Sequence, residues 1–527
     1  MQMGKIRSAI ITAIVALATL ALFFFGVVSF DLPGNIDRYN SILANIGLGS
    51  ELSGDVYTVL LPDGVITAEE YDFTVAEESS VADEYADTYV AAPGGAYYVD
   101  KAVLDVYAED DIADTEAEQQ QALGQLAEDI SRDAEVLAGR LANRNLTSFT
   151  VGVLGGYGLR VSVPSGYDFA TYAGYDLDSR SVGLNAASSI IGYLSRGGEL
   201  TLRNNDYGNR DAVTSAQTAD GGQVTYNILG TSLEAGDVFK SVKYFAMGGV
   251  YGIRITLTSE GRDVISEASA AIADTNQSSD QTIRFYVGES EVISLTCESA
   301  ITSASFDISV GDEATARNYA ALLNSAASGD TLSFVYDYDE VVNATAVGGE
   351  NTALFLAVAA LVVLAAVIAF SVARYRLLGL TFSLMAVLFS GIMIAVVYLV
   401  GITLTVAGVF TAMLTLALFT GCNFWSFEQI RRESDAGRTL QASVKTGYKK
   451  TFSGILDLHI VLLVVSVLLT LVCRGALSGC GMILLIGTLA SYILHWFTRF
   501  MWYATMSPAR DKYKFCGFSR EAFDDYE

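Results

Sequence analysis

The chain has 527 residues, of which 51% are hydrophobic and only 17% are charged, and its mean hydropathy is +0.38. This apolar composition excludes a largely disordered chain and indicates a membrane protein. Acidic residues outnumber basic ones by 59 to 32, giving a formal net charge of −27, so a nucleic-acid partner is not expected because its phosphates would be repelled.

The first predicted element is an apolar run over Ser8–Phe30, which is long enough for a helix that spans a bilayer. Lys5 and Arg7 precede it, so a cleavable signal peptide is an alternative. The run is longer than the apolar core of a signal peptide, and Val28–Phe30 offers no small-residue cleavage site. We therefore expect a retained membrane anchor.

A long insert, Asp31–Glu350, follows and carries most of the acidic residues of the chain. Its hydrophobic patterns intermingle strand and helix periods without regular alternation, so the sequence predicts an α+β domain. Solvation is the simplest role of the negative charge, and attraction of basic partners or cations is the alternative. The predicted strands are Val56–Leu61, Phe149–Leu154, Leu159–Val163, Tyr251–Leu257, Gln281–Val287, Glu291–Ser294 and Thr331–Tyr336, and the predicted helices are Ala122–Leu141, Val264–Ala271 and Ala314–Leu323.

Five more apolar runs follow the insert in quick succession. Because a chain in lipid must satisfy its backbone hydrogen bonds internally, and because no barrel-like alternation is present, each run is predicted to be a helix. The layout is therefore one span, a large insert and five further spans. The five runs are Thr352–Ala373, Leu377–Val400, Leu404–Phe427, Ile455–Cys473 and Leu477–Thr498.

Lysine and arginine residues gather at alternate ends of the predicted spans. Cytoplasmic loops are rich in these residues, so both termini are predicted to be cytoplasmic and the insert extracytoplasmic. The opposite short loops carry only Arg474. We expect Phe427–Lys450 to form one or two surface helices with cations near anionic lipid. The basic residues on the cytoplasmic side are Lys5, Arg7, Arg374, Arg376, Arg431, Arg432, Arg438, Lys445, Lys449, Lys450, Arg499, Arg510, Lys512, Lys514 and Arg520.

Polar residues inside the predicted spans are candidates for a transport role. Gly421–Asn423 interrupts the fourth span, and Asp457 lies about one turn inside the fifth. An ionisable residue within a span is costly and indicates function, although capping of the helix start by Asp457 is an equal alternative. His459 and His495 are predicted to lie near span ends, facing the membrane interface.

The sequence predicts neither an enzyme nor a bound cofactor or metal. Its histidines and cysteines are not clustered, and no phosphate-binding glycine loop follows a strand. The carboxylates of Glu109–Glu118 lack the spacing of a calcium loop and are predicted to be solvated. Cys297 is the single cysteine of the insert, while Cys473 and Cys480 are predicted to pack in helices rather than pair.

A series of motifs surrounds the exit of the fourth span: Gly408, Thr415 and Gly421–Glu433, then Gly437–Arg438 and Gly447–Asp457. These residues resemble the signature of the SecD family, whose fourth span passes through Asp-Ala-Asn and leaves through Phe-Glu-Arg-Ile-Arg-Glu-Glu. The family continues with Gly-Arg, Gly-Phe-Lys-Arg and Phe-Ser-Thr-Ile-Leu-Asp-Ala-Asn. Further similarities are Tyr375–Arg376 with Gly379, residues 127–164 and Gly252–Gly261, whereas Val65–Gln120 and Asp168–Gly248 are poorly covered.

The resemblance implies an accessory subunit of the Sec protein-export channel, within the resistance–nodulation–division superfamily. It implies a SecF-like partner, the channel proteins SecY, SecE and SecG, and SecA, with unfolded secretory polypeptide held by the external domain. It also implies six transmembrane helices in a 1 + 5 layout and an external ferredoxin-like base with an inserted head. The expected parts are the first span at 1–30, the external domain at 31–350 (base 51–164 and 312–340, head 165–311), the five-helix bundle at 351–500 with a cytoplasmic segment at 428–454, and a tail at 501–527.

Two departures from the family pattern bear on proton coupling. The family's span-four Asp, its supposed proton carrier, aligns with Gly421, and a glycine cannot titrate. Near the first strand the family reads Gly-Leu-Asp-Leu-x-Gly-Gly, whereas this chain has Gly-Leu-Gly-Ser-Glu-Leu-Ser-Gly-Asp over Gly47–Asp55. The candidate transport-related residues are Gly421, Asn423, Glu428, Arg431, Asp457 and His459.

Three hypotheses remain open. The first is a SecD-type export accessory whose proton coupling is weakened, lost or moved to its partner. In a variant of it, Asp457 or His459 titrates, and these two residues lie about 200° apart around a helix, so no direct pair is expected. The second is half of a superfamily exporter for lipids or small molecules, which usually has two external domains in one chain. The third is a non-transport receptor with an acidic ectodomain.

Overall fold

The computed structural model describes residues 5–30, 39, 41–77, 82–107, 115–144, 146, 148–165, 187–205, 216–218, 224–229, 233–273, 280–337, 341–344, 346, 351–473 and 475–506. The chain divides into two compact units. The helical unit comprises residues 1–55, 164–183 and 344–527, and the mixed unit comprises residues 56–163 and 184–343. Part of the acidic run Glu109–Glu118, Arg474 and the basic tail lie outside the described residues.

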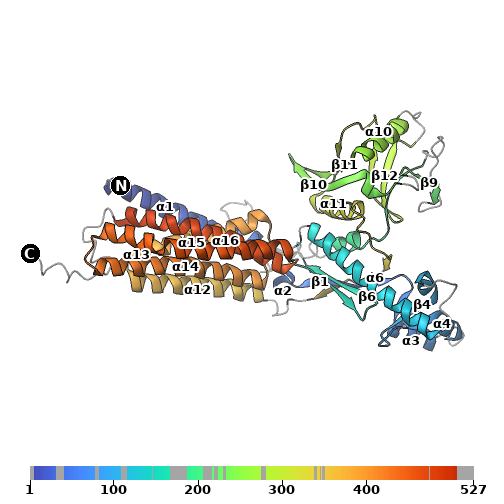
Figure 1. Ribbon diagram of the computed structural model, residues 1–527, viewed down its shortest axis with the longest axis horizontal. Helices are drawn as coiled ribbons and strands as arrows, with labels where there is room; N and C mark the ends of the chain where they lie inside the picture. Colours follow the sequence, from blue (N-terminus) through green and yellow to red (C-terminus); the bar gives the residue numbers. More distant parts are fainter. Residues whose placement is uncertain are drawn as a thin grey trace, which may run out of the picture. The chain divides into compact units, whose positions relative to one another are not determined.

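Within the described residues, six helices of the helical unit are long and apolar enough to cross a membrane. They lie side by side along their length (Figure 1). Each of the six predicted apolar runs forms a helix, although α1 ends at Val27 rather than Phe30 and α14 begins at Val406 rather than Leu404. The last three helices are longer than predicted. The helices are α1 (Lys5–Val27), α12 (Thr352–Tyr375), α13 (Leu377–Val400), α14 (Val406–Asp435), α15 (Leu440–Val472) and α16 (Ala476–Met506).

The segment Phe427–Lys450 does not form separate surface helices, contrary to the prediction. Helix α14 continues to Asp435 and α15 begins at Leu440, so only a short turn separates them. Gly447 allows the two helices to approach closely, because a Cβ atom there would lie 3.0 Å from the backbone nitrogen of Ile430. The polar residues of this segment therefore belong to the ends of two packed helices.

Aromatic rings and a glycine set the packing of α12, α13 and α14. Phe382 and Phe389 of α13 stack on Phe419 of α14, with ring centroids 5.5 and 5.2 Å apart. A Cβ atom at Gly379 would lie 1.9 Å from the carbonyl oxygen of Ser371, so only glycine lets α13 approach α12 this closely. This contact gives a physical reason for the glycine that follows the link between the two helices.

Residues 41–53, here called the linking segment, connect α1 with the first strand of the mixed unit and are fastened to the start of α14. The backbone of Gly49 donates to Leu404 and that of Leu404 donates to Gly47, at 2.8 Å each. The carboxylate of Glu51 accepts from the backbone nitrogen of Val406 at 3.0 Å, which satisfies an N-terminal amide of α14. The segment contains η1 (Leu43–Asn45) and α2 (Ser50–Ser53).

The mixed unit contains a sheet with the strand order β15, β1, β6, β5, in which β16 also pairs with β1. Along the chain the main elements follow in the order β1, α6, β5, β6, α11, β15. The predicted helix Ala122–Leu141 lies within α6, and its apolar residues at helical spacing are buried in the core, apart from Val136, which is partly buried: Leu123, Leu126, Ile130, Leu137 and Leu141. The elements are β1 (Asp55–Pro62), α6 (Glu116–Asn143), β5 (Thr150–Leu154), β6 (Gly158–Pro164), α11 (Glu313–Ala327), β15 (Tyr336–Asp337) and β16 (Val342–Ala344).

Two further sheets of the mixed unit are formed by the chain between β6 and α11. Their strand orders are β10, β11, β14 and β13, β12, β7, β9, β8, and α11 packs against β10 and β11 (Figure 1). The elements are β7 (Leu200–Asn204), β8 (Ala216–Thr218), β9 (Val224–Asn227), α9 (Ala235–Val238), β10 (Phe239–Met247), β11 (Val250–Leu257), α10 (Ser259–Ala273), β12 (Thr282–Val287), β13 (Ser290–Thr296) and β14 (Ser305–Val310).

The first of the two regions that the family resemblance covers poorly, Val65–Gln120, contains a small sheet of its own, with the strand order β2, β4, β3. The rings of Tyr71 and Tyr98 stack there with centroids 3.8 Å apart. The elements are β2 (Val65–Thr67), α3 (Ala68–Glu77), α4 (Ala82–Thr88), β3 (Tyr89–Ala91), β4 (Tyr97–Asp100), α5 (Lys101–Leu104) and η2 (Asp105–Tyr107).

The predicted strand Thr331–Tyr336 is wrong except at its last residue, and a buried carboxylate explains the difference. Asp133 of α6 accepts from the backbone of Ser333 at 2.8 Å and from that of Phe334 at 3.3 Å. It also accepts from the hydroxyl of Tyr336 at 2.8 Å. These amides bond to a side chain instead of a neighbouring strand. Burial raises the pKa of Asp133 above its usual range, although these hydrogen bonds oppose the shift.

A buried guanidinium on the same helix connects distant segments. Arg140 donates to the hydroxyl of Ser325 at 3.0 Å and to the carbonyl oxygens of Leu194 and Arg196 at 2.9 and 2.7 Å. It also donates to the carbonyl oxygen of Asp330 at 3.3 Å. Burial lowers the pKa of Arg140 to about 10, which the carboxylates of Asp133 and Asp330 partly offset. The guanidinium therefore stays charged at neutral pH.

We expect Asp133→Asn to destabilise the mixed unit by about 2–4 kcal/mol, because the new amide group faces backbone donors in a buried site. Hydrogen exchange on the full-length chain should show faster exchange at the amides of Ser333 and Phe334. The control is Asp129→Asn, one turn earlier on α6, where the side chain is part-exposed and bonds Tyr107. Equal protection in both variants would contradict the role given to Asp133.

Candidate functional site in the helix bundle

A set of polar side chains is buried between α14, α15 and α16, which pack against one another. Hydrocarbon offers no hydrogen bonds, so polar groups at this depth must bond within the protein or to a partner. We call this set the polar strip and take it as the core of the candidate site. It comprises Asn423 and Ser426 on α14, Thr451 and His459 on α15, and Ser491 and His495 on α16.

The ring of His459 joins α15 to α16. Its Nδ1 lies 2.7 Å from the carbonyl oxygen of Ile455, and its Nε2 lies 3.1 Å from the hydroxyl oxygen of Ser491. A carbonyl oxygen only accepts, so Nδ1 carries a proton and the neutral ring accepts at Nε2 from Ser491. The side chain is 2% exposed, which places it inside the bundle.

The side-chain oxygen of Asn423 is a buried acceptor that no described residue satisfies. Its amide nitrogen donates to the carbonyl oxygen of Phe419 one turn earlier, at 2.8 Å, whereas its buried Oδ1 meets no donor among the described residues. A buried acceptor without a donor is costly. The position can therefore accept a donor that comes from outside the described part of the chain.

The remaining members of the polar strip differ in their bonding. The hydroxyls of Ser426 and Thr451 lie 3.0 Å apart and link α14 to α15. His495 lies beside the ring of Tyr448, with centroids 5.1 Å apart. Within the described residues, neither Nδ1 of His495 nor the hydroxyl of Tyr448 has a hydrogen-bond partner.

Both histidines were expected near the membrane interface, and the structure places them in the bundle interior instead. The cause is that each ring faces a neighbouring helix, His459 facing Ser491 of α16 and His495 facing Tyr448 of α15. Neither His495 nor Ser491 was among the predicted members of the site. Their spacing of four residues, which places both on one face of α16, was the signal that could have found them.

Gly421 and Asp457 lie outside the polar strip, on the exposed surface of the bundle. Asp457 is in the middle of α15, so the alternative that it caps a helix start is wrong. Its exposed position contrasts with the burial of His459, as the predicted angular separation requires.

The register between α14 and α15 brings positions 421 and 457 to the same level. Ser426 meets Thr451, and a Cβ atom at Gly454 would lie 2.4 Å from the ring of Trp425. In two antiparallel helices one residue number rises as its neighbour's falls, so position 421 is level with about 457. A carboxylate thus stands at the level of Gly421, on the adjacent helix.

Glu428 and Arg431 lie on the last turns of α14. The carboxylate of Glu428 accepts from the guanidinium of Arg374 at 2.8 Å and from the hydroxyl of Tyr375 at 3.2 Å. This contact ties α14 to the end of α12. Arg431 is half-buried in the same region. Glu428 is therefore a helix-connecting residue at the bundle end rather than part of the polar strip.

The cations near the helix ends gather at one end of the bundle. The buried carboxylate of Glu433 pairs with Lys450 and, at 3.2 Å, with Arg438 across the turn between α14 and α15. The guanidinium of Arg499 on α16 lies 5.5 Å from the ring centre of Tyr448. The end of α12 lies at the same end of the bundle, because its Arg374 pairs with Glu428 of α14. The start of α1 lies there too, because the hydroxyl of Ser8 donates to the carbonyl oxygen of Ala504 near the end of α16.

No protein-family model matches the chain. Among curated proteins, the protein translocase subunit SecD of Anaeromyxobacter dehalogenans is 37% identical over 150 residues, which is 27% of this chain and 24% of that protein. SecD of Synechocystis is 28% identical over 251 residues, which is 46% of this chain and 51% of that protein. The matched region thus spans about half or less of the length of these relatives.

Among solved structures, a crystal structure of SecDF in a super-membrane-facing form is 17% identical and has a TM-score of 0.53. The alignment covers 95% of this chain and 57% of that chain. The chain is therefore similar in sequence to SecD proteins and has a fold that SecDF shares. Its six apolar helices and this similarity identify it as a membrane protein.

We expect Ser491→Ala to lower the stability of the detergent-solubilised protein by about 1 kcal/mol, because Nε2 of His459 loses its donor in a buried site. The measurement is thermal unfolding at fixed detergent and protein concentration. The control is Ser466→Ala on α15, whose buried hydroxyl bonds only the carbonyl oxygen of Leu463 in its own helix. An equal loss in both variants would argue against a specific bond between the helices.

Proposed function

We propose that the chain is a SecD-type accessory subunit of the Sec protein translocase, which assists export of unfolded polypeptides and has no enzymatic activity of its own. Its similarity to SecD proteins, in one alignment over 251 residues, carries the proposal. The SecDF fold over 95% of the chain supports it. We further propose a SecF-like partner that supplies the other half of the membrane unit, acting beside the Sec channel.

In the proposed topology the chain lies in the cytoplasmic membrane, with both termini in the cytoplasm and the mixed unit outside. The gathering of Arg374, Arg438, Lys450 and Arg499 at one end of the bundle supports this orientation, because cytoplasmic ends are rich in such residues. The six helices would then form the 1 + 5 arrangement.

The proposed base of the external unit is ferredoxin-like. Its elements follow in the order β1, α6, β5, β6, α11, β15, and its strands lie in the order β15, β1, β6, β5. This succession of strands and helices is the one expected for that fold and supports the assignment. The sheets between β6 and α11 would form the inserted head.

The head would hold emerging polypeptide along a sheet edge. Strand β10 is an edge strand, and its hairpin with β11 exposes Met247 (71%) and Val250 (49%). An extended peptide can add to such an edge through backbone hydrogen bonds, with apolar side chains contributing contacts. This mode suits unfolded chains of varied sequence, because backbone bonds do not depend on side chains.

The proton route, in this proposal, runs over the outer surface of α14 and α15 rather than through the polar strip. Gly421 cannot titrate, and Asp457 offers a carboxylate at the same level. An exposed carboxylate in a span is costly in lipid, which favours a partner helix opposite it. Asp457 would exchange the proton there, whereas Asn423 is buried in the polar strip and out of the partner's reach.

Co-purification of the full-length chain from its own membranes tests the partnership. We expect a SecF-like chain and the Sec channel proteins to be recovered in mild detergent. A second arm uses a protease on wall-stripped intact cells, which should cleave the mixed unit and spare the tail. Recovery of neither partner, or protection of the mixed unit, would contradict the proposal.

Replacement of Asp457 tests the proton step. We expect Asp457→Asn to reduce gradient-dependent secretion severalfold, because the proposed carrier can no longer ionise. The measurement compares secretion of a model preprotein with and without a proton gradient. Asp435→Asn, an exposed carboxylate at the end of α14, is the control and should leave secretion unchanged.

A second replacement restores the family carboxylate. Gly421→Asp should fit without a clash, because no atom lies within 4 Å of a Cβ atom there. Combined with Asp457→Asn, it should recover part of the lost gradient dependence. Normal secretion by Asp457→Asn alone would rule out Asp457 as the carrier.

A further inference from the structure

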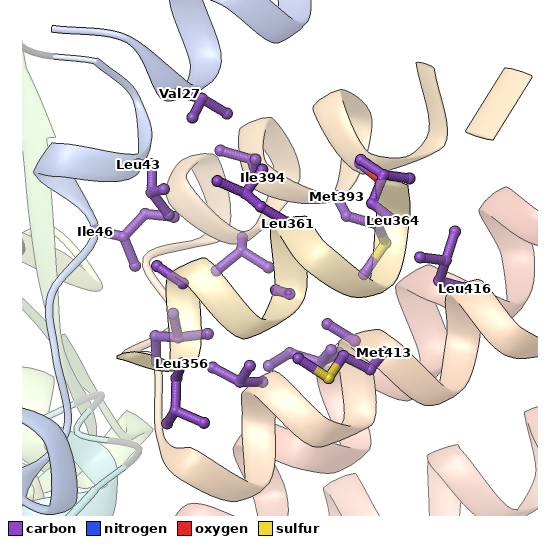
Figure 2. A pocket seen from close by; sticks show the side chains of 18 of the residues that line it. Val27, Leu43, Ile46, Leu356, Leu361, Leu364, Met393, Ile394, Met413 and Leu416 are labelled. Carbon is purple, nitrogen blue, oxygen red and sulfur yellow. The ribbon is translucent and has the colours of Figure 1, made fainter. Parts of the chain in front are cut away.

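The helical unit contains an apolar pocket of about 190 Å³ that the transport proposal does not use. Its walls come from α1, the linking segment, α12, α13, α14 and α16. Figure 2 shows Leu43 and Ile46 of the linking segment on one side of the pocket and Met393 and Leu364 on the other.

The lining excludes a polar or charged ligand. Among the described residues that line the pocket, Ser390 has the one polar side chain, and its hydroxyl already donates to the carbonyl oxygen of Ala386 at 3.0 Å. None of these described lining residues is titratable. A water molecule or an ion would therefore find no hydrogen-bond partner there, whereas an apolar group needs none.

The size of the pocket excludes a partner helix as its occupant. A helix with its side chains is about 10 Å across, too wide to enter between the helices that form the walls, because α12 packs against α13 and α14 and α13 packs against α1. A single flexible hydrocarbon chain is narrow enough to enter. Met393 and Met413 in the wall add side chains that adapt to an occupant without a fixed shape.

The pocket opens to the surroundings of the bundle, and those surroundings are lipid. Leu361 of α12 lines the pocket and is still 43% exposed, so the wall beside α12 is incomplete. An apolar cavity left empty inside a protein lowers its stability, because its lining atoms lack contacts. In a bilayer the nearest groups that can fill it are acyl methylenes.

We propose that this pocket holds one acyl chain of a membrane phospholipid, which enters beside α12. The acyl chain would pack beneath the linking segment, where Leu48 and Leu52 also line the pocket. That segment is hydrogen-bonded to Leu404 and Val406 and leads directly into β1. The bound chain is thus a structural ligand that supports the connection between helix α1 and the mixed unit. The proposal rests on the membrane placement of the helices and not on the export role.

The test is photocross-linking of the full-length chain in phospholipid nanodiscs that contain a phospholipid with a diazirine in the middle of one acyl chain. We expect cross-links on the peptides that contain Met393 and Met413. Ala360→Phe, which fills the pocket from α12, should reduce these cross-links severalfold. Ala359→Phe is the matched control, because residue 359 is exposed on the same helix and absent from the lining.

A second variant and a second probe keep the test independent of folding. Ala412→Phe fills the pocket from α14 and should lower the same cross-links, while thermal unfolding reports whether either variant is intact. A diazirine fatty acid replaces the phospholipid in a further arm. Cross-links from the free fatty acid alone, or wild-type cross-links no stronger in the pocket than on exposed α12 residues, would overturn the proposal. Equal labelling of the wild-type chain and both intact pocket-filling variants would also overturn it.

Discussion

A polar group that lies within hydrocarbon can bond only to the protein, and the helical unit is organised by this constraint. It makes each apolar run a helix, and it draws the hydroxyl of Ser491 to the ring of His459 and that of Ser426 to Thr451. Oδ1 of Asn423 meets no donor within the described residues. Because this acceptor is fully buried, its missing bond lowers the stability of the bundle.

The same constraint separates the two kinds of polar residue in the bundle. Four residues of the polar strip, Ser426, Thr451, His459 and Ser491, form bonds that link α14 to α15 and α15 to α16, so a change in them affects stability first. Gly421 and Asp457 face outward, and no cation of the described residues forms an ion pair with Asp457. The helices α14 and α15 are antiparallel, and their register places position 457 level with position 421. The carboxylate of Asp457 on α15 therefore lies at the level where a carboxylate at position 421 on α14 would lie.

Buried charge has a different role in the mixed unit. Asp133 and Arg140 lie two turns apart on one face of α6 and bind backbone groups of segments that are distant in sequence. The carboxylate of Asp133 accepts from the backbone amides of Ser333 and Phe334 in place of a neighbouring strand, which is why the chain there is not a strand. In the linking segment a side chain likewise satisfies a backbone group, because the carboxylate of Glu51 accepts from the backbone nitrogen of Val406 in the first turn of α14.

The sequence alone determined the six apolar helices, the α+β character of the insert and six of its strands (β1, β5, β6, β11, β12 and β13), because these follow from hydrophobic period, length and turn residues. The other strands of the insert, among them β7, β10 and β14, were not predicted. It also identified the motif around Gly421–Glu433. Only the tertiary structure decided that α14 and α15 run through Phe427–Lys450, that His459 and His495 face inward and that Asp457 faces outward. These features depend on which helix packs against which, and at what register. Glycine contacts such as Gly447 on Ile430 set that register between residues far apart in the chain, and no local pattern carries it.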